Sequence, residues 1–157
     1  MIHRIHISST GELEDIPAIG DLVQSYCRLH RIPDRIAYHL RLALDELLTN
    51  TMSYGFSRDA REHLIDIRLQ LSPPWLITEV EDNGPPFNPL EAPTPDLHAS
   101  VENRAIGGLG IHLVRSVIDH LDYRHHADCN ILQLRQALPE PDGDAGDINQ
   151  PVTRDRP

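Results

Sequence analysis

The feature that most constrains the fold of this chain is a pair of extended segments joined by a short proline turn. Residues 64–71 alternate apolar with polar side chains, and residues 75–82, WLITEVED, resume extended structure after the sequence SPP. Successive side chains of a strand point to opposite faces, so this alternation is typical of a strand with one buried face. We therefore predict two neighbouring antiparallel strands.

Helical periodicity appears on both sides of this predicted hairpin. Apolar residues recur at helical spacing over residues 15–30, and again from Asp34, which follows the break at Pro33, to about Tyr54. A third, amphipathic helix is predicted after the sequence GGLG. Its apolar face comprises Leu113, Val114, Val117, Ile118 and Leu121.

Two further strand signals complete the predicted sheet. A short alternating run at residues 2–7 predicts a first strand, and residues 121–138 predict a final pair of strands that turns near Asp128. We find no internal repeat. The expected fold is α+β: a two-layer sandwich of a mixed, mostly antiparallel sheet with about three helices on one face.

A chain of 157 residues is long enough for one compact domain, which we assign to residues 1–138. Within it, residues 83–106 hold five prolines and no sustained periodicity. A loop of this length in a compact domain is usually functional or mobile, so we expect a lid. Residues 139–157 are polar and rich in proline and glycine, and we expect a disordered tail.

Charge and cysteine content narrow the function classes. The formal net charge is −10, and no run of Lys or Arg interleaves with aromatic residues, so direct binding of nucleic acid is not expected. Cys27 and Cys129 form no C-x-x-C motif, which fits inert thiols in a reduced, cytoplasmic protein. Residues 1–20 lack a signal-peptide pattern and no apolar run reaches membrane-spanning length, so we expect no membrane association.

Glu46 and Asn50 lie beside the apolar stripe of the second predicted helix. Residues four apart lie about 40° apart around a helix axis, so the two side chains are neighbours at the seam between core and solvent. One interpretation is that Glu46 is an ordinary solvated helix residue and Asn50 a weak helix former near the end of the helix. The other is a metal and base pair, because an Asn oxygen is a hard ligand suited to Mg²⁺ and a nearby carboxylate can orient or deprotonate a hydroxyl.

Asp82 ends the second hairpin strand and is followed by Asn83 and Gly84. Turn chemistry accounts for this sequence by itself. A buried carboxylate, however, accepts hydrogen bonds only, so it selects an exocyclic amine such as that of adenine over a carbonyl. Gly84 would let a base approach the backbone closely, so a turn and a base-reading site both remain open.

Glycines cluster at residues 107–110, GGLG, where the third helix begins. The cluster fits a flexible hinge. It also fits a phosphate site, because glycines before a helix N-terminus expose backbone N–H groups at the positive end of the helix dipole. The ten histidines, by contrast, including His120, His125 and His126, show no convincing metal-ligand spacing, and we expect surface or edge-strand positions for them.

The order of these signals resembles the GHKL, or Bergerat-fold, ATP-binding superfamily, and within it the small anti-sigma factor serine/threonine kinases. The segment LALDELLTNTMSYGF is similar to the N box of that family, and VEDNGPPFNP is similar to its G1 box. The segment GGLGIHLVRSVIDHLDY, followed by NILQL, is similar to its G2 box and terminal strands. The resemblance extends from residue 1 to about residue 138.

The resemblance implies a role for each candidate residue. It makes Glu46 the general base, Asn50 the Mg²⁺ ligand and Asp82 the carboxylate that reads adenine. It places the remaining nucleotide contacts at Gly84, Gly107, Gly108 and Gly110. The implied cofactors are ATP and Mg²⁺.

The same resemblance implies a partner-switching kinase. Such a protein binds and silences a sigma factor. It also phosphorylates a serine or threonine of a small anti-sigma factor antagonist, which otherwise captures the kinase and frees the sigma factor. The resemblance further suggests a homodimer.

Pro86 departs from the family pattern. The usual G1 box carries a second glycine at this position, and here two prolines, Pro85 and Pro86, follow Gly84. Proline supplies neither an N–H nor a positive φ, so the turn under the nucleotide must be built in another way.

Two alternative functions stay open. A holding module would need ATP or ADP only as a structural ligand and would regulate its partner by binding it; Glu46 favours the enzyme, because such a module needs no base. The other alternative is the catalytic domain of a sensor histidine kinase. We do not expect it, because only about 30 residues precede the second helix and no helix pair with a phosphorylatable histidine is found there.

Overall fold

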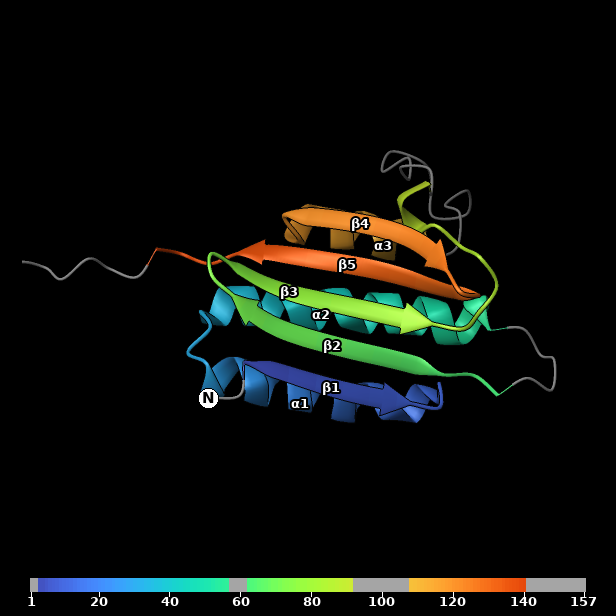
Figure 1. Cartoon of the computed structure of the whole chain (residues 1–157), viewed down its shortest axis with the longest axis horizontal. Coiled ribbons are helices and arrows are strands. Elements are labelled where there is room, and N and C mark those ends of the chain that lie inside the picture. Colours follow the sequence, from blue (N-terminus) through green and yellow to red (C-terminus); the bar gives the residue numbers. More distant parts are fainter. Residues whose placement is uncertain (1–2, 57–61, 92–107, 141–157) are drawn as a thin grey trace, which may run out of the picture.

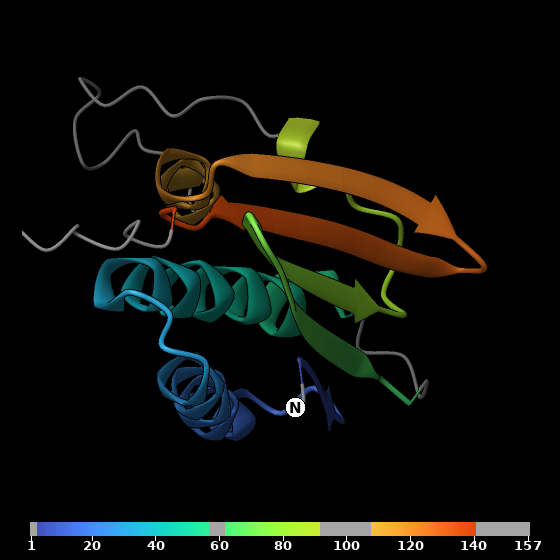
Figure 2. The same cartoon turned by 60° about the vertical axis from the view of Figure 1, so that its left-hand side comes forward.

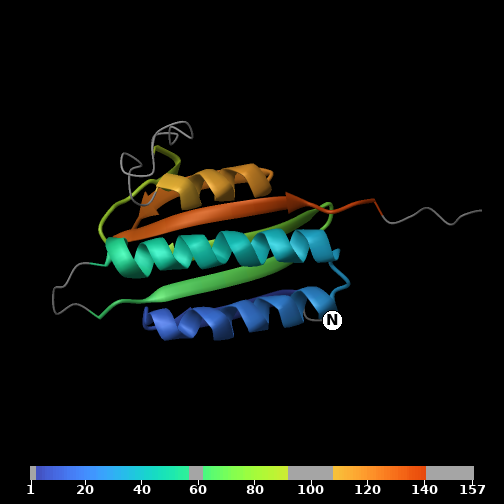
Figure 3. The same cartoon turned by 180° about the vertical axis from the view of Figure 1, so that it is seen from behind.

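The computed structural model describes residues 3–56, 62–91 and 108–140, which form a five-stranded sheet covered on one face by helices (Figures 1 and 3). The strands are β1 (Arg4–Ser9), β2 (Ile65–Ser72), β3 (Trp75–Asp82), β4 (His120–His126) and β5 (Cys129–Ala137). The helices are α1 (Ile16–Leu29), α2 (Asp34–Asn50) and α3 (Gly108–Val117). Short 3₁₀ turns lie at Leu13–Asp15 and Pro89–Glu91, and a π-helical turn lies at Thr51–Gly55. The expected α+β sandwich is confirmed.

The strand order is β1-β2-β3-β5-β4, and every pairing among the described strands is antiparallel, where we expected a mixed sheet. β2 and β3 form the predicted hairpin, with Ser72 opposite Trp75. β4 and β5 form a second hairpin, which turns as predicted at Ala127 and Asp128, both with positive φ. Because β5 enters between β3 and β4 and runs opposite to both, the sheet stays antiparallel throughout.

The hydrophobic core lies between the sheet and the helical layer, in which α2 occupies the middle (Figures 2 and 3). Alternate strand residues point toward this layer, so the period-2 pattern of the sequence becomes one buried face. The most deeply buried large side chains are Val23, Leu40, Leu44, Leu48, Ile65, Ile67, Leu69, Leu76, Val114 and Leu134. α2 is thereby packed against the sheet and both other helices, which holds the residues on its remaining face in place.

The third helix ends earlier than its apolar pattern predicts. α3 stops at Val117, and Leu121, which we expected on its apolar face, belongs to β4. Leu121 pairs with Leu134 of β5 and packs against the core from the strand, so helical spacing and strand burial select the same residue. The carboxylate of Asp119, between the two elements, accepts a hydrogen bond from the N–H of Ala137 at the end of β5. That bond anchors the chain to the sheet where the helix has ended.

The other boundaries lie close to their predicted positions. α2 continues through the π-helical turn to Gly55, and β1 extends to Ser9, two residues beyond the predicted end of the first strand. His120, His125 and His126 are exposed on β4, which is an edge strand, as expected.

The predicted lid and tail lie mostly outside the described residues. The lid, residues 83–106, is described as far as residue 91, and the tail, residues 139–157, as far as residue 140. Both stay predictions. Within the described ranges, no helix has the length and apolar character needed to cross a membrane.

Candidate functional site

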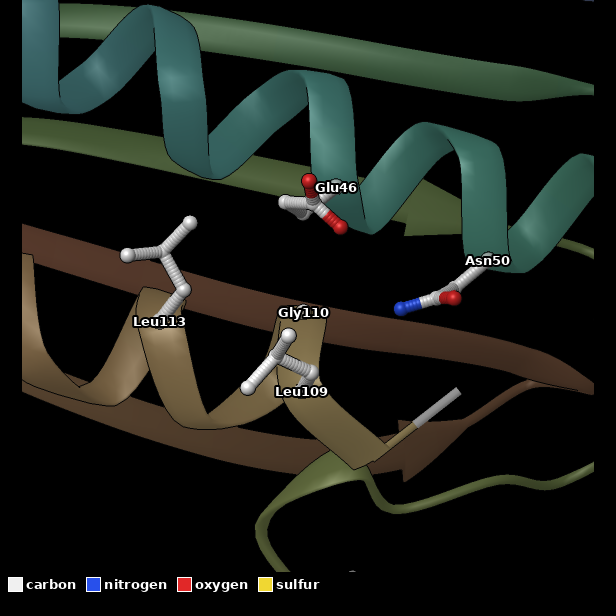
Figure 4. Close-up of a pocket in the computed structure, with 5 residues that line it drawn as sticks. All are labelled: Glu46, Asn50, Leu109, Gly110 and Leu113. Carbon is white, nitrogen blue, oxygen red and sulfur yellow. The ribbon is translucent and has the colours of Figure 1, made fainter. Parts of the chain in front are cut away.

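α2 carries Glu46 and Asn50 on the side that faces the first turn of α3 (Figure 4). The opposite side of α2 packs into the core through Leu44 and Leu48, so the helix cannot rotate to move the polar pair. A hollow of about 260 Å³ lies between the two helices and is lined by Glu46, Asn50, Leu109, Gly110 and Leu113. The structure therefore brings the two predicted α2 residues together with a predicted glycine of α3.

Gly110 allows α3 to approach this polar pair closely. A Cβ on Gly110 would overlap Glu46 Oε2 and would lie 3.6 Å from Asn50 Nδ2. Gly110 belongs to the first turn of α3, whose backbone N–H groups have no partner within the helix. The Glu46 carboxylate thus lies beside the positive end of a helix dipole, next to backbone N–H groups of the kind that bind anions.

Asn50 carries a polar atom that the protein leaves unpaired. Its Nδ2 is buried and has no hydrogen-bond partner in the described part of the chain. A buried amide without a partner costs about 1–3 kcal/mol, and this one lines the hollow, where a ligand would be able to pair with it. Rotation of the amide by 180° exchanges oxygen and nitrogen, so the same position can present an acceptor to a cation.

The π-helical turn at Thr51–Gly55 follows Asn50 directly. Such turns are rare and occur often at functional sites. Gly55 O and Phe56 Cδ1 each lie 3.3 Å from the position that a Cβ on Gly84 would take. The end of the α2 segment therefore touches the loop that follows β3.

The carboxylate of Asp82, at the end of β3, has one hydrogen-bonded oxygen and one oxygen without a donor among the described residues. Oδ1 accepts hydrogen bonds from Gly84 N and from Asn130 Nδ2, each at 2.9 Å, and no described residue donates to Oδ2. Burial raises the pKa of the Asp82 carboxyl, while the hydrogen bonds from Asn130 and Gly84 and the nearby His125 act in the opposite direction. One oxygen of a partly desolvated carboxylate is thus left as an acceptor.

The predicted site residues fall into two groups. They are linked where Gly55, in the turn that follows Asn50, approaches Gly84. The first group lines the hollow and comprises Glu46, Asn50 and Gly110. The second lies at the end of β3, does not line that hollow, and comprises Asp82 and Gly84. Of the other two predicted residues, Gly108 begins α3 and Gly107 lies outside the described residues.

Sequence reasoning missed two residues, Asn130 and Arg115. Asn130 is buried opposite Asp82 on β5, and its only sequence signal is a polar residue at an inward position of an alternating strand. The guanidinium of Arg115, on α3, donates to the carbonyl oxygens of Pro89 and Leu90. Arg115 therefore ties the helix of the first group to the loop that leaves the second.

Comparison with known proteins establishes the family. Residues 10–136 match the histidine kinase-like ATPase domain, and the chain belongs to that family, as the resemblance of its three boxes predicts. The chain is also 29% identical over 100 residues to the serine/threonine-protein kinase BtrW of Bordetella bronchiseptica. That alignment covers 64% of this chain and 70% of BtrW.

Two solved structures share the fold. The RsbU and RsbW domains of Rv1364c from Mycobacterium tuberculosis match with a TM-score of 0.63 and 13% identity, over 88% of this chain and 33% of that one. The histidine kinase domain of the Erythrobacter litoralis EL346 blue-light activated histidine kinase matches with a TM-score of 0.50 and 17% identity, over 80% of this chain and 60% of that one. This chain thus spans about a third and three fifths of the two matched chains, and the likeness establishes the fold.

Proposed function

We propose that this protein is an ATP-dependent serine/threonine protein kinase that also acts as an anti-sigma factor. The observation that carries the proposal is the hollow between α2 and α3, where Glu46, the unpaired amide of Asn50 and the first turn of α3 meet. Membership of the ATPase family and the similarity to a serine/threonine-protein kinase support it.

The residues present fit ATP and Mg²⁺. Asn50 offers an amide oxygen, which is a hard ligand suited to Mg²⁺, and the nitrogen of the same amide has no hydrogen-bond partner among the described residues. The first turn of α3 offers backbone N–H groups to phosphate oxygens, and Gly110 leaves the space that a side chain would fill. Asp82 Oδ2 offers an acceptor to an exocyclic amine.

These features support the following assignments. Asn50 holds the Mg²⁺, and Asp82 with Gly84 forms the adenine site. The phosphate loop comprises Gly107, Gly108 and Gly110.

Glu46 is the proposed general base. When bound, ATP supplies the phosphoryl group, and Mg²⁺ offsets the charge on its phosphates. The Glu46 carboxylate orients the serine or threonine hydroxyl of the substrate protein and accepts its proton. Leu113 supplies an apolar wall to the same hollow.

The proposed biological role is partner switching in the cytoplasm. The kinase, as a homodimer, binds a sigma factor and phosphorylates a small anti-sigma factor antagonist, without itself contacting nucleic acid. The similarity of the three sequence boxes to anti-sigma factor kinases supports this role. The net charge of −10 also favours association with a basic partner such as a protein that contacts DNA.

A second function has one observation in its favour. Because Glu46 lies against the N-terminal turn of α3, its carboxylate can stabilise the helix dipole without any catalytic role. The protein would then be a nucleotide-binding module that regulates its partner by holding it, without significant kinase activity.

The variant Glu46→Gln separates the two functions. Phosphate transfer from labelled ATP to candidate antagonist proteins is expected to fall about 10²–10⁴-fold, the usual contribution of a general base, while ATP affinity is kept. Asp45→Asn is the matched control, because Asp45 is the neighbouring carboxylate on α2 and pairs with Arg41. Transfer at the wild-type rate in Glu46→Gln would remove Glu46 from the base role. ATP binding without transfer in the wild type would favour the holding module.

A further inference from the structure

Asn130 connects Asp82 to the loop that carries the two prolines. Its side chain is 6% exposed and lies on the helix side of β5. Nδ2 donates to Asp82 Oδ1 at 2.9 Å, to Pro85 O at 2.9 Å and to Gly84 O at 3.3 Å. One amide nitrogen therefore contacts the carboxylate and two consecutive carbonyl groups of the loop.

The other end of the same amide is also paired. Asn130 Oδ1 accepts hydrogen bonds from Phe87 N at 3.0 Å and from Tyr123 Oη at 2.7 Å. A backbone N–H only donates and a carbonyl oxygen only accepts, so these groups determine which end of the amide carries the nitrogen. Because Phe87 N fixes the oxygen, Nδ2 must face Asp82.

The contacts of Asn130 supply hydrogen bonds to the loop after Asp82, which has few backbone donors of its own. Pro85 and Pro86 have no N–H, so the turn has two fewer backbone donors than a glycine-containing turn. Asn130 holds this stretch from outside, by the carbonyls of Gly84 and Pro85 before the second proline and by the N–H of Phe87 after it. A side chain of the sheet thus shapes a turn that lacks its own donors.

We infer that Asn130 is a positioning residue for nucleotide recognition: its amide builds the Gly84–Phe87 turn around the prolines and fixes Asp82 with Oδ1 occupied and Oδ2 left for the ligand. The nucleotide part of this inference rests on the proposed function, whereas the turn and the orientation of Asp82 do not. Tyr123 supports the arrangement because its hydroxyl anchors Asn130 Oδ1.

Asn130 also favours the charged form of Asp82, which is the form that accepts from an amine. A hydrogen bond to a carboxylate lowers its pKa, so removing Asn130 is expected to raise the pKa of Asp82 beyond the increase that burial already causes. The other titratable groups that face Asp82 are His125 and Tyr123 of β4 and Cys129 of β5. Without Asn130, ATP affinity should therefore fall off at a higher pH on acidification.

The test compares ATP binding by the full chain in the wild type, Asn130→Ala and Gln136→Ala. Asn130→Ala is expected to weaken ATP binding about ten- to a hundredfold, the effect of losing a hydrogen bond to a charged group. Selectivity for ATP over inosine triphosphate, which carries a carbonyl in place of the amine, should fall, and the acid limb of the affinity profile should move to higher pH. ATP itself titrates equally in every sample, so the comparison between proteins isolates the effect of Asp82.

Gln136→Ala is the matched control. Gln136 is a second buried amide on the same face of β5, 3% exposed, and its Nε2 donates to Ile36 O at 3.1 Å. It lies six residues, or about 20 Å, from Asn130 along the strand. Its loss should lower stability but leave ATP affinity, base selectivity and the pH profile unchanged.

Two further measurements cover other outcomes. Tyr123→Phe removes one anchor of the amide with little change in volume, and a loss of affinity of about threefold is expected. Amide hydrogen exchange at Phe87, measured without nucleotide, should quicken in Asn130→Ala and not in Gln136→Ala. If the wild type binds no ATP, the proposed function fails. The exchange rate at Phe87 then still tests whether Asn130 holds the Gly84–Phe87 turn. Unchanged exchange at Phe87, or wild-type affinity and base selectivity in Asn130→Ala, overturns the inference.

Discussion

The two groups of site residues differ in how completely their polar atoms are paired. In the hollow between α2 and α3, the Asn50 amide nitrogen is buried without a partner in the described part of the chain. At the end of β3, both ends of the Asn130 amide and one oxygen of Asp82 are hydrogen-bonded within the protein. The first group therefore leaves a polar atom available to a ligand, whereas the second is already hydrogen-bonded within the protein.

This contrast assigns the two groups different physical tasks. In the hollow between α2 and α3, the two helices approach each other at Gly110, and the nearest side-chain atom is the flexible end of Glu46. This side chain can therefore move during a reaction. The turn after β3 offers a fixed acceptor, which suits recognition of a base, because a preorganised hydrogen-bonding group loses little entropy on binding. Substitutions of Glu46 and Gly110 in the hollow should act mainly on catalysis, substitution of Asn50 should act on Mg·ATP binding, and substitutions in the turn should act on stability and on affinity for the base.

The largest effect is expected for Gly110→Ala in the hollow between α2 and α3. The added Cβ overlaps Glu46 Oε2, the end of a flexible side chain, so the carboxylate should move aside while the fold is kept. The rate of phosphate transfer should fall about a hundredfold or more. The thermal unfolding temperature should stay equal or rise, because alanine is favoured over glycine in a helix by up to about 1 kcal/mol. A wild-type transfer rate in this variant would show that the position of Glu46 is unimportant.

A smaller effect, and one on stability, is expected for Gly84→Ala in the turn. Its Cβ would lie 2.9 Å from Asp82 Oδ1 and 3.3 Å from Gly55 O, and these atoms belong to a bonded turn that has little freedom to shift. A loss of about 1–2 kcal/mol is expected, together with weaker ATP binding. Gly55→Ala is the control, because the nearest atoms to its Cβ are at 3.8 and 4.0 Å. Equal unfolding temperatures for the two variants would contradict the difference between the groups.

The smallest effect is a pair of opposite pH dependences, measured by thermal unfolding of Asp82→Asn and Asp66→Asn. Burial raises the pKa of Asp82, so its ionisation penalises the folded state as pH rises from the unfolded value near 3.8 through the folded value. Asp66 has its pKa lowered, chiefly by the hydroxyl of Ser8, so it stabilises the folded state above the unfolded pKa, and this stability is lost as pH falls through the folded one.

At neutral pH, and without nucleotide, Asp82→Asn should therefore raise the unfolding temperature and Asp66→Asn should lower it, each by less than about 4 °C. An asparagine at position 82 keeps an acceptor for Gly84 N and Asn130 Nδ2, so the comparison isolates the charge. Shifts of the same sign in both variants would contradict the account.

Much of this arrangement is readable from local patterns. The four-residue spacing of Glu46 and Asn50 within one amphipathic helix places them side by side whatever the rest of the fold does. The hairpin of β2 and β3 follows equally from alternation and a turn, and it brings Asp82 to the end of a strand.

The remainder depends on contacts between distant segments, which no local period reveals. Asn130 and Asp82 are 48 residues apart in the chain, and only the pairing of β5 with β3 makes them neighbours. The end of α3 was misplaced for a related reason: Leu121 is apolar at helical spacing, but the strand that contains it buries the same side chain. In both cases tertiary packing decides between local alternatives.

The central claim is that the hollow between α2 and α3 binds Mg·ATP. It is tested most directly by the shift in unfolding temperature on adding ATP with and without Mg²⁺. Wild type, Asn50→Ala and the exposed neighbour control Thr49→Ala are compared. A ligand at 100 times its dissociation constant stabilises by about 2.7 kcal/mol, which is several degrees for a domain of this size. We predict a Mg²⁺-dependent rise in the wild type and Thr49→Ala that is lost in Asn50→Ala. No rise in a folded wild type, or an equal rise in Asn50→Ala, would contradict the claim.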